Sequence, residues 1–486
     1  MAEVPLLGPG GLAVLGLYLV GLLVIGWLGR RAQQEQTLAD FYLAGRGIGV
    51  FVLFLTLYAT QYSGNTLIGF AGRTYRQGFE ALALLMLMMI VIGAFALFAP
   101  KLYRLSQERG YLTISDYVHD RFGSTALTVS VSLACIVALG NYILTNLKAI
   151  GFIVEVSTGG RIGFAEGVIV LAVIMVIYET LGGLRSVAWT DVIQGILLLI
   201  GCACIFVAIQ VEYGGLRTLA PELQALRPDF WTPPDADAKR GWLSTILLSA
   251  FAISMYPHAI QRIYAARSAR TLRRSLQWMA FMPLVTTFFI VIVGLIAVVQ
   301  FPELSRAESE EVTLLVLGDL AARVPALSIV LVVFLCAAIA AIMSTVDSAL
   351  LALSALFTQD LYRRARPGQS QRHLTRVGKS FSWVAMVLCV YLALTVPETI
   401  WRIIEIKLEL LCQVAPAVFL GLHMKRLSTR GVLVGFLLGT GLAVGFMLLG
   451  GTWLPSRPWG IHAGLWGLML NLATIAAFTL AERQQV

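Results

Sequence analysis

The stretch Ala341-Ile-Met-Ser-Thr-Val-Asp-Ser348 places two hydroxyls, a carboxylate and a third hydroxyl within an otherwise apolar run long enough to span a membrane. Polar and ionisable groups at membrane depth cost free energy, so they commonly mark functional sites. Hydroxyl and carboxylate oxygens are ligands that suit a small, hard cation. The stretch therefore predicts a helix of a membrane protein that binds an ion near the middle of the membrane.

The composition of the chain also indicates a membrane protein. Of its 486 residues, 58% are hydrophobic and 13% are charged, whereas soluble globular proteins contain about 25% charged residues. Long apolar runs recur along the whole chain and leave no stretch for a sizeable soluble domain. We therefore expect an all-α, multi-pass protein that forms a single transmembrane domain over residues 1–486 and contacts the lipid bilayer.

The apolar runs predict about thirteen membrane-spanning helices. Their approximate ranges are 10–29, 48–72, 78–99, 124–153, 162–180, 188–210, 242–264, 277–300, 325–358, 376–396, 400–422, 431–450 and 461–480. If the N-terminus is outside, about 23 of the 36 Lys and Arg residues, Arg262 among them, fall on the inner side. Because cytoplasmic loops carry an excess of Lys and Arg, this distribution predicts an outside N-terminus and an inside C-terminus.

Two of these spans contain interruptions. The second contains Ala59-Thr-Gln-Tyr-Ser-Gly64, and the seventh contains Tyr256-Pro257-His258, where the proline removes a helix hydrogen bond. Interrupted helices at corresponding positions of two halves indicate an inverted-repeat transporter with its site near mid-membrane. The predicted parts are a leading helix (10–29), two repeats of five helices (48–210 and 242–422) and two trailing helices (431–480).

Other chemistries find no support in the sequence. The net charge of +9 does not indicate a nucleic-acid partner, because the basic residues lie in short loops between spans. The six cysteines fall inside spans without CxxC spacing, so neither a disulfide framework nor a zinc site is indicated. The sequence contains no glycine-rich phosphate loop and no nucleophile motif. We expect no enzyme activity, no cofactor and no metal other than the small cation.

Several motifs resemble those of one transporter family. Phe41-Tyr-Leu-Ala-Gly-Arg46 resembles the entry signature of the sodium:solute symporter family, and Gly182-Gly-Leu-Arg-Ser-Val-Ala-Trp-Thr-Asp-Val-Ile-Gln194 resembles its sixth-span motif. Residues 341–348, followed by Asp360-Leu-Tyr362, resemble its ninth-span motif, and residues 257–262 are similar to proline and pantothenate members. The resemblance implies a LeuT-type fold with a 5+5 inverted repeat, sodium-coupled solute uptake and a location in the bacterial inner membrane.

The resemblance further implies a main sodium site. Its ligands would be the carbonyls of Ala59, Tyr62 and Ala341 and the hydroxyls of Ser344 and Thr345. The residue types agree with this assignment, because an interrupted helix frees backbone carbonyls and five oxygens can replace a hydration shell. The alternative is that both hydroxyls only bond to the carbonyl four residues earlier, as Ser and Thr commonly do in membrane helices.

A second cation or proton site is implied at Asp191, Asp347 and Ser348. Asp191 matches an acidic position that contributes to a second sodium site in some members, whereas Asp347 stands where two-sodium members typically have serine. Ser344, Asp347 and Ser348 share one helical face. A second cation, a proton and a structural polar contact are all compatible with these residues, and Asp191 could instead be a helix-start cap.

Polar residues on three spans are candidates for solute binding. They are Gln61, Ser63 and Asn65 on the second span, Asn141, Tyr142, Thr145 and Lys148 on the fourth, and Tyr256 and Gln261 on the seventh. Gln61 stands where proline transporters carry an aspartate, which argues against close kinship with them. Lys148 could hold a carboxylate substrate, pair with a protein carboxylate or reach toward the outer interface. Tyr256 could be an inner gate or a packing residue.

The sequence therefore predicts sodium-coupled symport of a small organic solute by alternating access. An organic anion is the first choice of substrate, an amino acid the second and a sugar the third. Glu405, Lys407 and Glu409 read as a charged cluster that is structural or a gate, because Lys407 has carboxylates as sequence neighbours. Proton-coupled transport and solute sensing are the alternatives. A monomer is sufficient, and the oligomeric state stays open.

Overall fold

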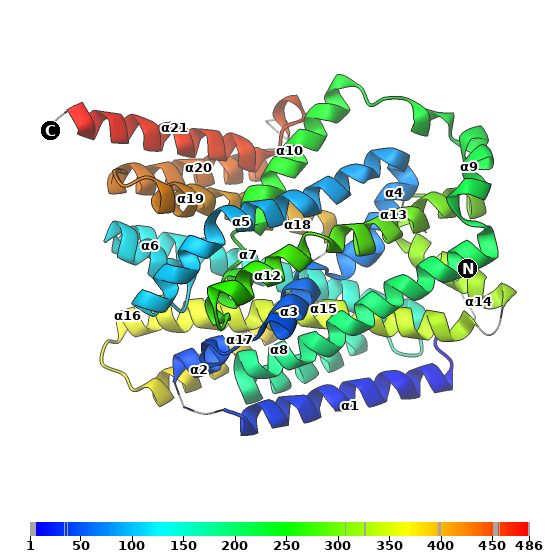
Figure 1. The fold of residues 1–486 in the computed structure, drawn as a ribbon, viewed down its shortest axis with the longest axis horizontal. Coiled ribbons are helices and arrows are strands. Elements are labelled where there is room, and N and C mark those ends of the chain that lie inside the picture. Colours follow the sequence, from blue (N-terminus) through cyan, green and yellow to red (C-terminus); the bar gives the residue numbers. More distant parts are fainter. Residues whose placement is uncertain are drawn as a thin grey trace.

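The computed structural model describes residues 6–33, 35, 37–306, 308–324, 327–396, 400–450, 455 and 457–484. Most of these residues lie in helices, and an isolated bridge joins Ile48 to Ala266. The long helices form one bundle, with α1 (Pro9–Arg31) along one side and α20 (Thr429–Leu449) and α21 (Ala463–Gln484) on the opposite side (Figure 1). The all-α prediction is confirmed.

The other helices follow the chain between these two sides. They are α2 (Leu38–Leu43), α3 (Val50–Gln61), α4 (Phe70–Gln77), α5 (Ala83–Arg109), α6 (Ile114–Phe122), α7 (Thr125–Ser157), α8 (Phe164–Tyr213), α9 (Gly215–Leu226), α10 (Ala236–Ile253), α11 (Pro257–Ala265), α12 (Ala269–Met279), α13 (Met282–Gln300), α14 (Val312–Arg323), α15 (Ser328–Leu356), α16 (Arg363–Ala365), α17 (Gln371–Thr395), α18 (Ile400–Leu411) and α19 (Ala415–His423).

The number of spans differs from the sequence prediction. Ten helical segments of the described residues are long and apolar enough to cross a membrane, or eleven if the bent pair α10–α11 is one span, so thirteen is not confirmed. One reason is that α8 runs over 50 residues, about 75 Å if it were straight, where the sequence predicts two spans. Another is that α3 has only 12 residues, because the predicted second span is broken after it.

Gly183 interrupts α8 between the two predicted spans. Its φ is +58° and its ψ is −146°, a backbone conformation that glycine adopts far more readily than other residues. A Cβ atom at this position would lie 2.2 Å from the carbonyl oxygen of Phe41 in α2. The chain therefore changes direction here, and the lack of a side chain lets α2 pack against the kink.

Both predicted interruptions are confirmed. α3 ends at Gln61, and Tyr62 has extended backbone with φ −102° and ψ 97°. The chain then resumes as a π-helical turn over Asn65–Gly69 before α4. In the second half, α10 and α11 meet at a bend of 49° in front of Pro257. Each break leaves backbone carbonyls without helical partners inside the bundle.

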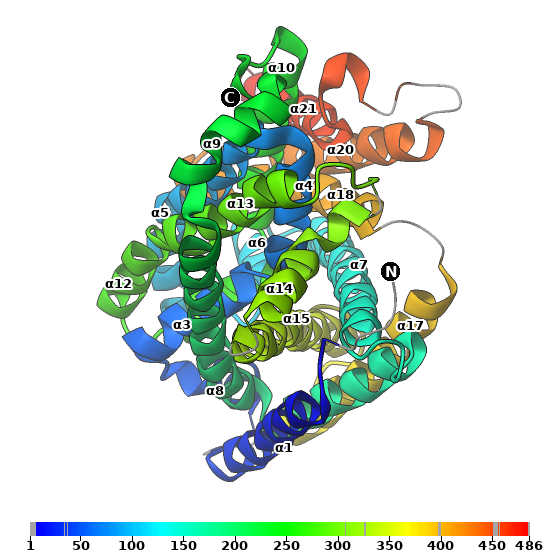
Figure 2. The ribbon, with the colours of Figure 1, turned by 90° about the vertical axis from the view of Figure 1, so that its right-hand side faces the viewer.

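α15 lies at the centre of the bundle. It packs against α3, α7, α8 and α11, and Figure 2 shows it between α7 and α8. Every residue from Phe334 to Leu356 is buried. A helix that is apolar on all sides is an interior helix. The polar groups of residues 344–348 therefore face protein rather than lipid, and their contacts decide what they do.

Candidate functional site

The break after α3 lies directly against α15. The hydroxyl of Ser344 lies 2.9 Å from the carbonyl oxygens of both Ala59 and Ala341, to which it donates. The hydroxyl of Thr345 donates to the same Ala341 carbonyl at 2.9 Å. Four of the five groups that the sequence assigns to the main sodium site are thus connected by hydrogen bonds between two helices.

The fifth group, the carbonyl of Tyr62, belongs to the residue at which the helix ends. Nearby, the chain approaches α15 so closely that a Cβ on Gly64 would lie 2.4 Å from the side chain of Ile342. The Thr345 bond is the local contact to the carbonyl four residues earlier that any membrane helix can make. The contact between Ser344 and Ala59 is not local, and it joins the broken helix to the central one.

A second polar cluster surrounds Asp191 of α8 and Arg262 of α11. Nη2 of Arg262 lies 2.9 Å from the Asp191 carboxylate, and its Nε donates to the hydroxyl of Thr56 at 2.8 Å. The guanidinium also donates to the hydroxyl of Ser348, and Thr56 donates to Asp191. All four side chains are buried. Asp191 lies well inside α8, so the helix-start cap is excluded and its role is that of an ion-pair partner.

Asp347 stands beside this cluster on α15. Its carboxylate accepts hydrogen bonds from the hydroxyl of Tyr178 at 2.5 Å and from the hydroxyl of Ser348 at 3.2 Å. Within the described part of the chain, no basic side chain forms an ion pair with Asp347. Asp191, Asp347 and Ser348 therefore lie in one network, in which a protein guanidinium contacts two of the three.

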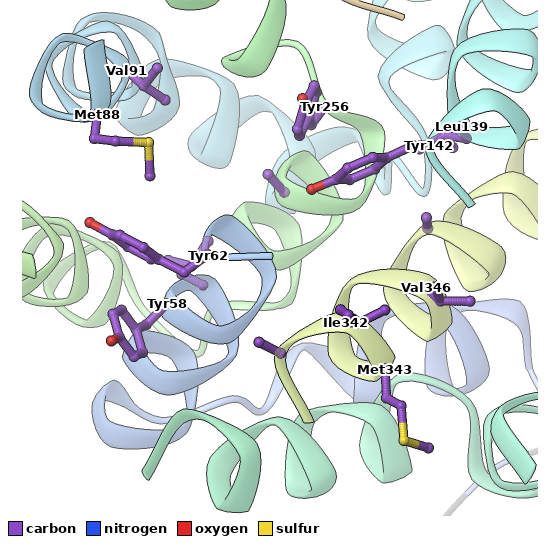
Figure 3. Packing of buried hydrophobic residues seen from close by; sticks show 14 of the residues in the cluster. Tyr58, Tyr62, Met88, Val91, Leu139, Tyr142, Tyr256, Ile342, Met343 and Val346 are labelled. Atoms are coloured by element: carbon purple, nitrogen blue, oxygen red, sulfur yellow. The ribbon is translucent and has the colours of Figure 1, made fainter. Parts of the chain in front are cut away.

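Aromatic rings gather where α7 meets the break between α10 and α11. The rings of Tyr142 and Tyr256 lie next to each other, tilted by 46° with centroids 5.4 Å apart (Figure 3). The ring of His258 lies 5.7 Å from Tyr142 and 5.0 Å from Tyr256. The hydroxyl of Tyr142 approaches those of Ser63 and Thr345. This aromatic cluster, Tyr142–Tyr256–His258, therefore borders the oxygens at the break of α3.

The remaining candidates for solute binding are placed differently. Gln61 is partly buried at the end of α3, and Ser63 is buried in the break. Gln261 is buried, and neither polar atom of its side chain has a hydrogen-bond partner among the described residues. The side chain of Asn65 lies outside the described part of the structure.

On α7, the candidate residues beyond Tyr142 make contacts within the protein. The ammonium of Lys148 donates to the carbonyl of Val396 at the end of α17, and Thr145 donates to the carbonyl of Asn141 at 2.9 Å. The side-chain oxygen of Asn141 is buried without a hydrogen-bond partner among the described residues. Lys148 thus ties α7 to α17, while Asn141 retains an acceptor for another group.

Arg262 is the residue of the second polar cluster that the sequence analysis places wrongly. The charge distribution assigns it to an inside loop, together with the arginines that follow in the sequence, but its side chain is completely buried. The sequence contained a signal for this, because Arg262 follows Pro257 within one short helix and stands between Ile260 and Ile263. A single arginine among apolar residues of a membrane helix indicates a buried partner.

The contacts of Lys407 also differ from those that the sequence analysis predicts. Glu405 pairs with Arg457, and Glu409 lies 3.8 Å from Nδ1 of His462. Residues four apart share a helix face, whereas residues two apart do not, so both glutamates point away from Lys407. The ammonium instead lies 3.3 Å from the ring centroid of Tyr142. The three residues therefore do not form one charged cluster.

Comparison with known proteins places this geometry in context. The model of the sodium:solute symporter family matches residues 41–439. The sodium/pantothenate symporter of Escherichia coli is 27% identical over 434 residues, which cover 87% of each chain. The osmoregulated proline transporter OpuE of Bacillus subtilis is 26% identical over 472 residues, 94% of this chain and 92% of that protein.

Two solved structures share the fold. One is a substrate-bound outward-open state of a Na⁺-coupled sialic acid symporter, with a TM-score of 0.78, 19% identity and coverage of 98% of each chain. The other is Mhp1, a nucleobase-cation-symport-1 family transporter in a closed conformation, with a TM-score of 0.58, 14% identity and coverage of 91% and 95%. These likenesses confirm the predicted LeuT-type fold.

Proposed function

Because this chain belongs to the sodium:solute symporter family, we propose that it imports a small organic solute with sodium bound between the break of α3 and α15. The observation that carries the proposal is the contact of the Ser344 hydroxyl with the Ala59 carbonyl. It brings a carbonyl of a broken helix and a hydroxyl of the central helix to one place. The carbonyls of Tyr62 and Ala341 and the hydroxyl of Thr345 would complete a shell of five oxygens.

A cation at this place couples to conformation because its ligands belong to different helices. Sodium stabilises the arrangement in which α3 and α15 are aligned, and their separation dismantles the shell and releases the ion. With the N-terminus outside, the site opens first to the exterior and then to the cytoplasm. Each charge that moves down the membrane potential contributes about 2.3 kcal/mol per 100 mV to the cycle. The halves that move would be the predicted repeats, 48–210 and 242–422.

The second polar cluster supports one sodium ion per cycle. The guanidinium of Arg262 already supplies a positive charge to Asp191 and a donor to Ser348. A second cation beside it would be repelled by that charge in a medium of low dielectric constant. Arg262 thus takes the place of a second ion. Asp347, which has two hydroxyl donors and no ion pair among the described residues, is the carboxyl that a proton-coupled cycle would use.

For the solute, a small organic anion is the first choice. The relative named a sodium/pantothenate symporter supports it, since pantothenate is a carboxylate. An amino acid is the second choice, which the relative named a proline transporter supports. Both classes carry a carboxylate, so the site requires a group that can bind one.

Uptake into proteoliposomes tests the proposal. The protein is reconstituted, and accumulation of radiolabelled carboxylates and amino acids is followed under an inward gradient of sodium, potassium or choline. We expect the solute to accumulate under the sodium gradient and not under the potassium or choline gradient. Accumulation that is unchanged when choline replaces sodium contradicts the proposal, and accumulation driven by a proton gradient without sodium supports the alternative. Binding without transport would indicate a sensor.

A further inference from the structure

Lys407 presents a buried positive charge to the aromatic cluster. Its side chain on α18 is only 3% exposed. The Nζ atom lies 3.3 Å from the ring centroid of Tyr142 and 5.1 Å from that of Tyr256. An ammonium over an aromatic face gains cation–π energy of about 2 kcal/mol when both are desolvated, which is less than the several kcal/mol that removing the ion from water costs. The two rings alone do not compensate this charge.

No carboxylate of the described residues forms an ion pair with Lys407. The two nearest in sequence are engaged elsewhere, Glu405 with Arg457 and Glu409 beside His462. Buried charges in proteins are paired or bind a ligand. Lys407 thus has the environment of a receptor for an anion.

Polar atoms without partners lie on the same elements as the aromatic cluster. Among the described residues, Nδ1 of His258, both polar atoms of Gln261 and the side-chain oxygen of Asn141 have no hydrogen-bond partner. His258 and Gln261 are three apart on α11 and share a face, and Asn141 is next to Tyr142 on α7. Leaving such buried groups unsatisfied costs about 1–3 kcal/mol each. On one face of α11, His258 and Gln261 therefore offer donors and acceptors for the polar parts of a small solute.

We infer that the ammonium of Lys407, framed by Tyr142 and Tyr256, binds the carboxylate of the transported solute. The inference rests on the proposed function, which supplies a solute but not the residue that recognises it. Because the hydroxyl of Tyr142 also approaches Thr345, the bound carboxylate would lie next to the oxygens proposed for sodium. The bound carboxylate would then neutralise the charge of Lys407, which lies over the ring of Tyr142. Its binding would also depend on sodium, because the proposed sodium ligands lie near the Tyr142 hydroxyl.

The test compares acids with their amides, since an amide keeps the shape and loses the charge. Thermal unfolding of the full chain in detergent is measured in sodium with four pairs: pantothenate and pantothenamide, lactate and lactamide, proline and prolinamide, nicotinate and nicotinamide. We expect at least one acid to stabilise the protein and its amide to be without effect at the same concentration. A panel in which no acid stabilises the protein, or in which an amide matches its acid, overturns the inference.

Variants then locate the charge. Lys407→Gln should weaken binding of the stabilising acid by more than about 30-fold while stabilisation by sodium alone persists. Lys407→Arg should retain part of the affinity. Lys101→Gln removes the same charge from an exposed position on α5 and should change nothing. Unchanged affinity of the acid for Lys407→Gln overturns the inference.

The two proposals fail in distinguishable ways. Uptake that does not depend on sodium contradicts the proposed sodium symport, whichever residue binds the acid. If uptake depends on sodium but the Lys407→Gln variant still binds the acid, only the role inferred for Lys407 is contradicted. If Lys407→Gln does not fold, the comparison of acids with amides on the unchanged protein still decides whether a positive charge recognises the solute.

Discussion

Nη2 of Arg262 lies 2.9 Å from the carboxylate of Asp191, and both side chains are completely excluded from solvent. The pair joins α11, which follows the second helix break, to α8, and a donor from the same guanidinium reaches Ser348 on the central helix α15. Because Thr56 of α3 bonds to both members of the pair, the cluster connects four helices, α3, α8, α11 and α15. It also places a permanent protein charge where the sequence predicts a second cation or proton site.

Breaking this ion pair on one side should destabilise the protein. Asp191→Asn or Arg262→Gln leaves the other charge buried without its partner, which costs about 3–5 kcal/mol. The double variant removes both charges and should recover most of the loss. Thermal unfolding in choline buffer, without sodium, measures the effect. Equal stability of the wild type and both single variants would show that the pair contributes nothing.

Arg262 should also set the number of sodium ions. In the wild type we expect sodium to activate uptake with a Hill coefficient of about 1, because the guanidinium already occupies the cluster around Asp191. In Arg262→Gln the freed carboxylate should accept a second ion and raise the coefficient above 1. Asp191→Asn/Arg262→Gln should return it to about 1. A wild-type coefficient near 2 in sodium-activation curves would contradict this assignment.

Gly183 should not tolerate a side chain. Its φ is positive, and the Phe41 carbonyl oxygen lies 2.2 Å from the place that a Cβ would take. Gly183→Ala therefore strains the backbone and separates α2 from the kink of α8. We expect loss of folded protein in fluorescence-detected size exclusion. Gly93→Ala in α5 is the matched control, because no heavy atom lies within 4 Å of a Cβ there. Equal yields of the two variants would refute the role given to the kink.

The elements that the sequence predicts well are those whose signals are local. The interruption at residues 59–64 and the proline at 257 are visible in single spans, and the polar run 344–348 identifies the central helix. The contact between Ser344 and Ala59 is different. The family resemblance implies that these residues share a site, whereas equal depth in the membrane does not tell which helices touch.

What the sequence does not reveal are partners from distant elements. The pairing of Arg262 with Asp191 depends on how α11 packs against α8, and charge counting assigns the arginine to a loop instead. The direction of Lys407 could have been predicted, since helix geometry turns it away from Glu405 and Glu409. That it faces Tyr142 could not, because that contact arises from the packing of α18 against α7. The number of spans also depends on Gly183, whose kink is a backbone feature.

Thermal unfolding of the purified protein in sodium and in choline, compared between wild type and Ser344→Ala, tests the central claim most directly. A ligand that binds only the folded state stabilises it, by about 2.7 kcal/mol at 100 times its Kd. We predict that sodium raises the unfolding temperature of the wild type, that Ser344→Ala abolishes the rise, and that Ser328→Ala, at the exposed start of the same helix, preserves it. An equal rise in wild type and Ser344→Ala, or none in wild type, would contradict a sodium site between α3 and α15.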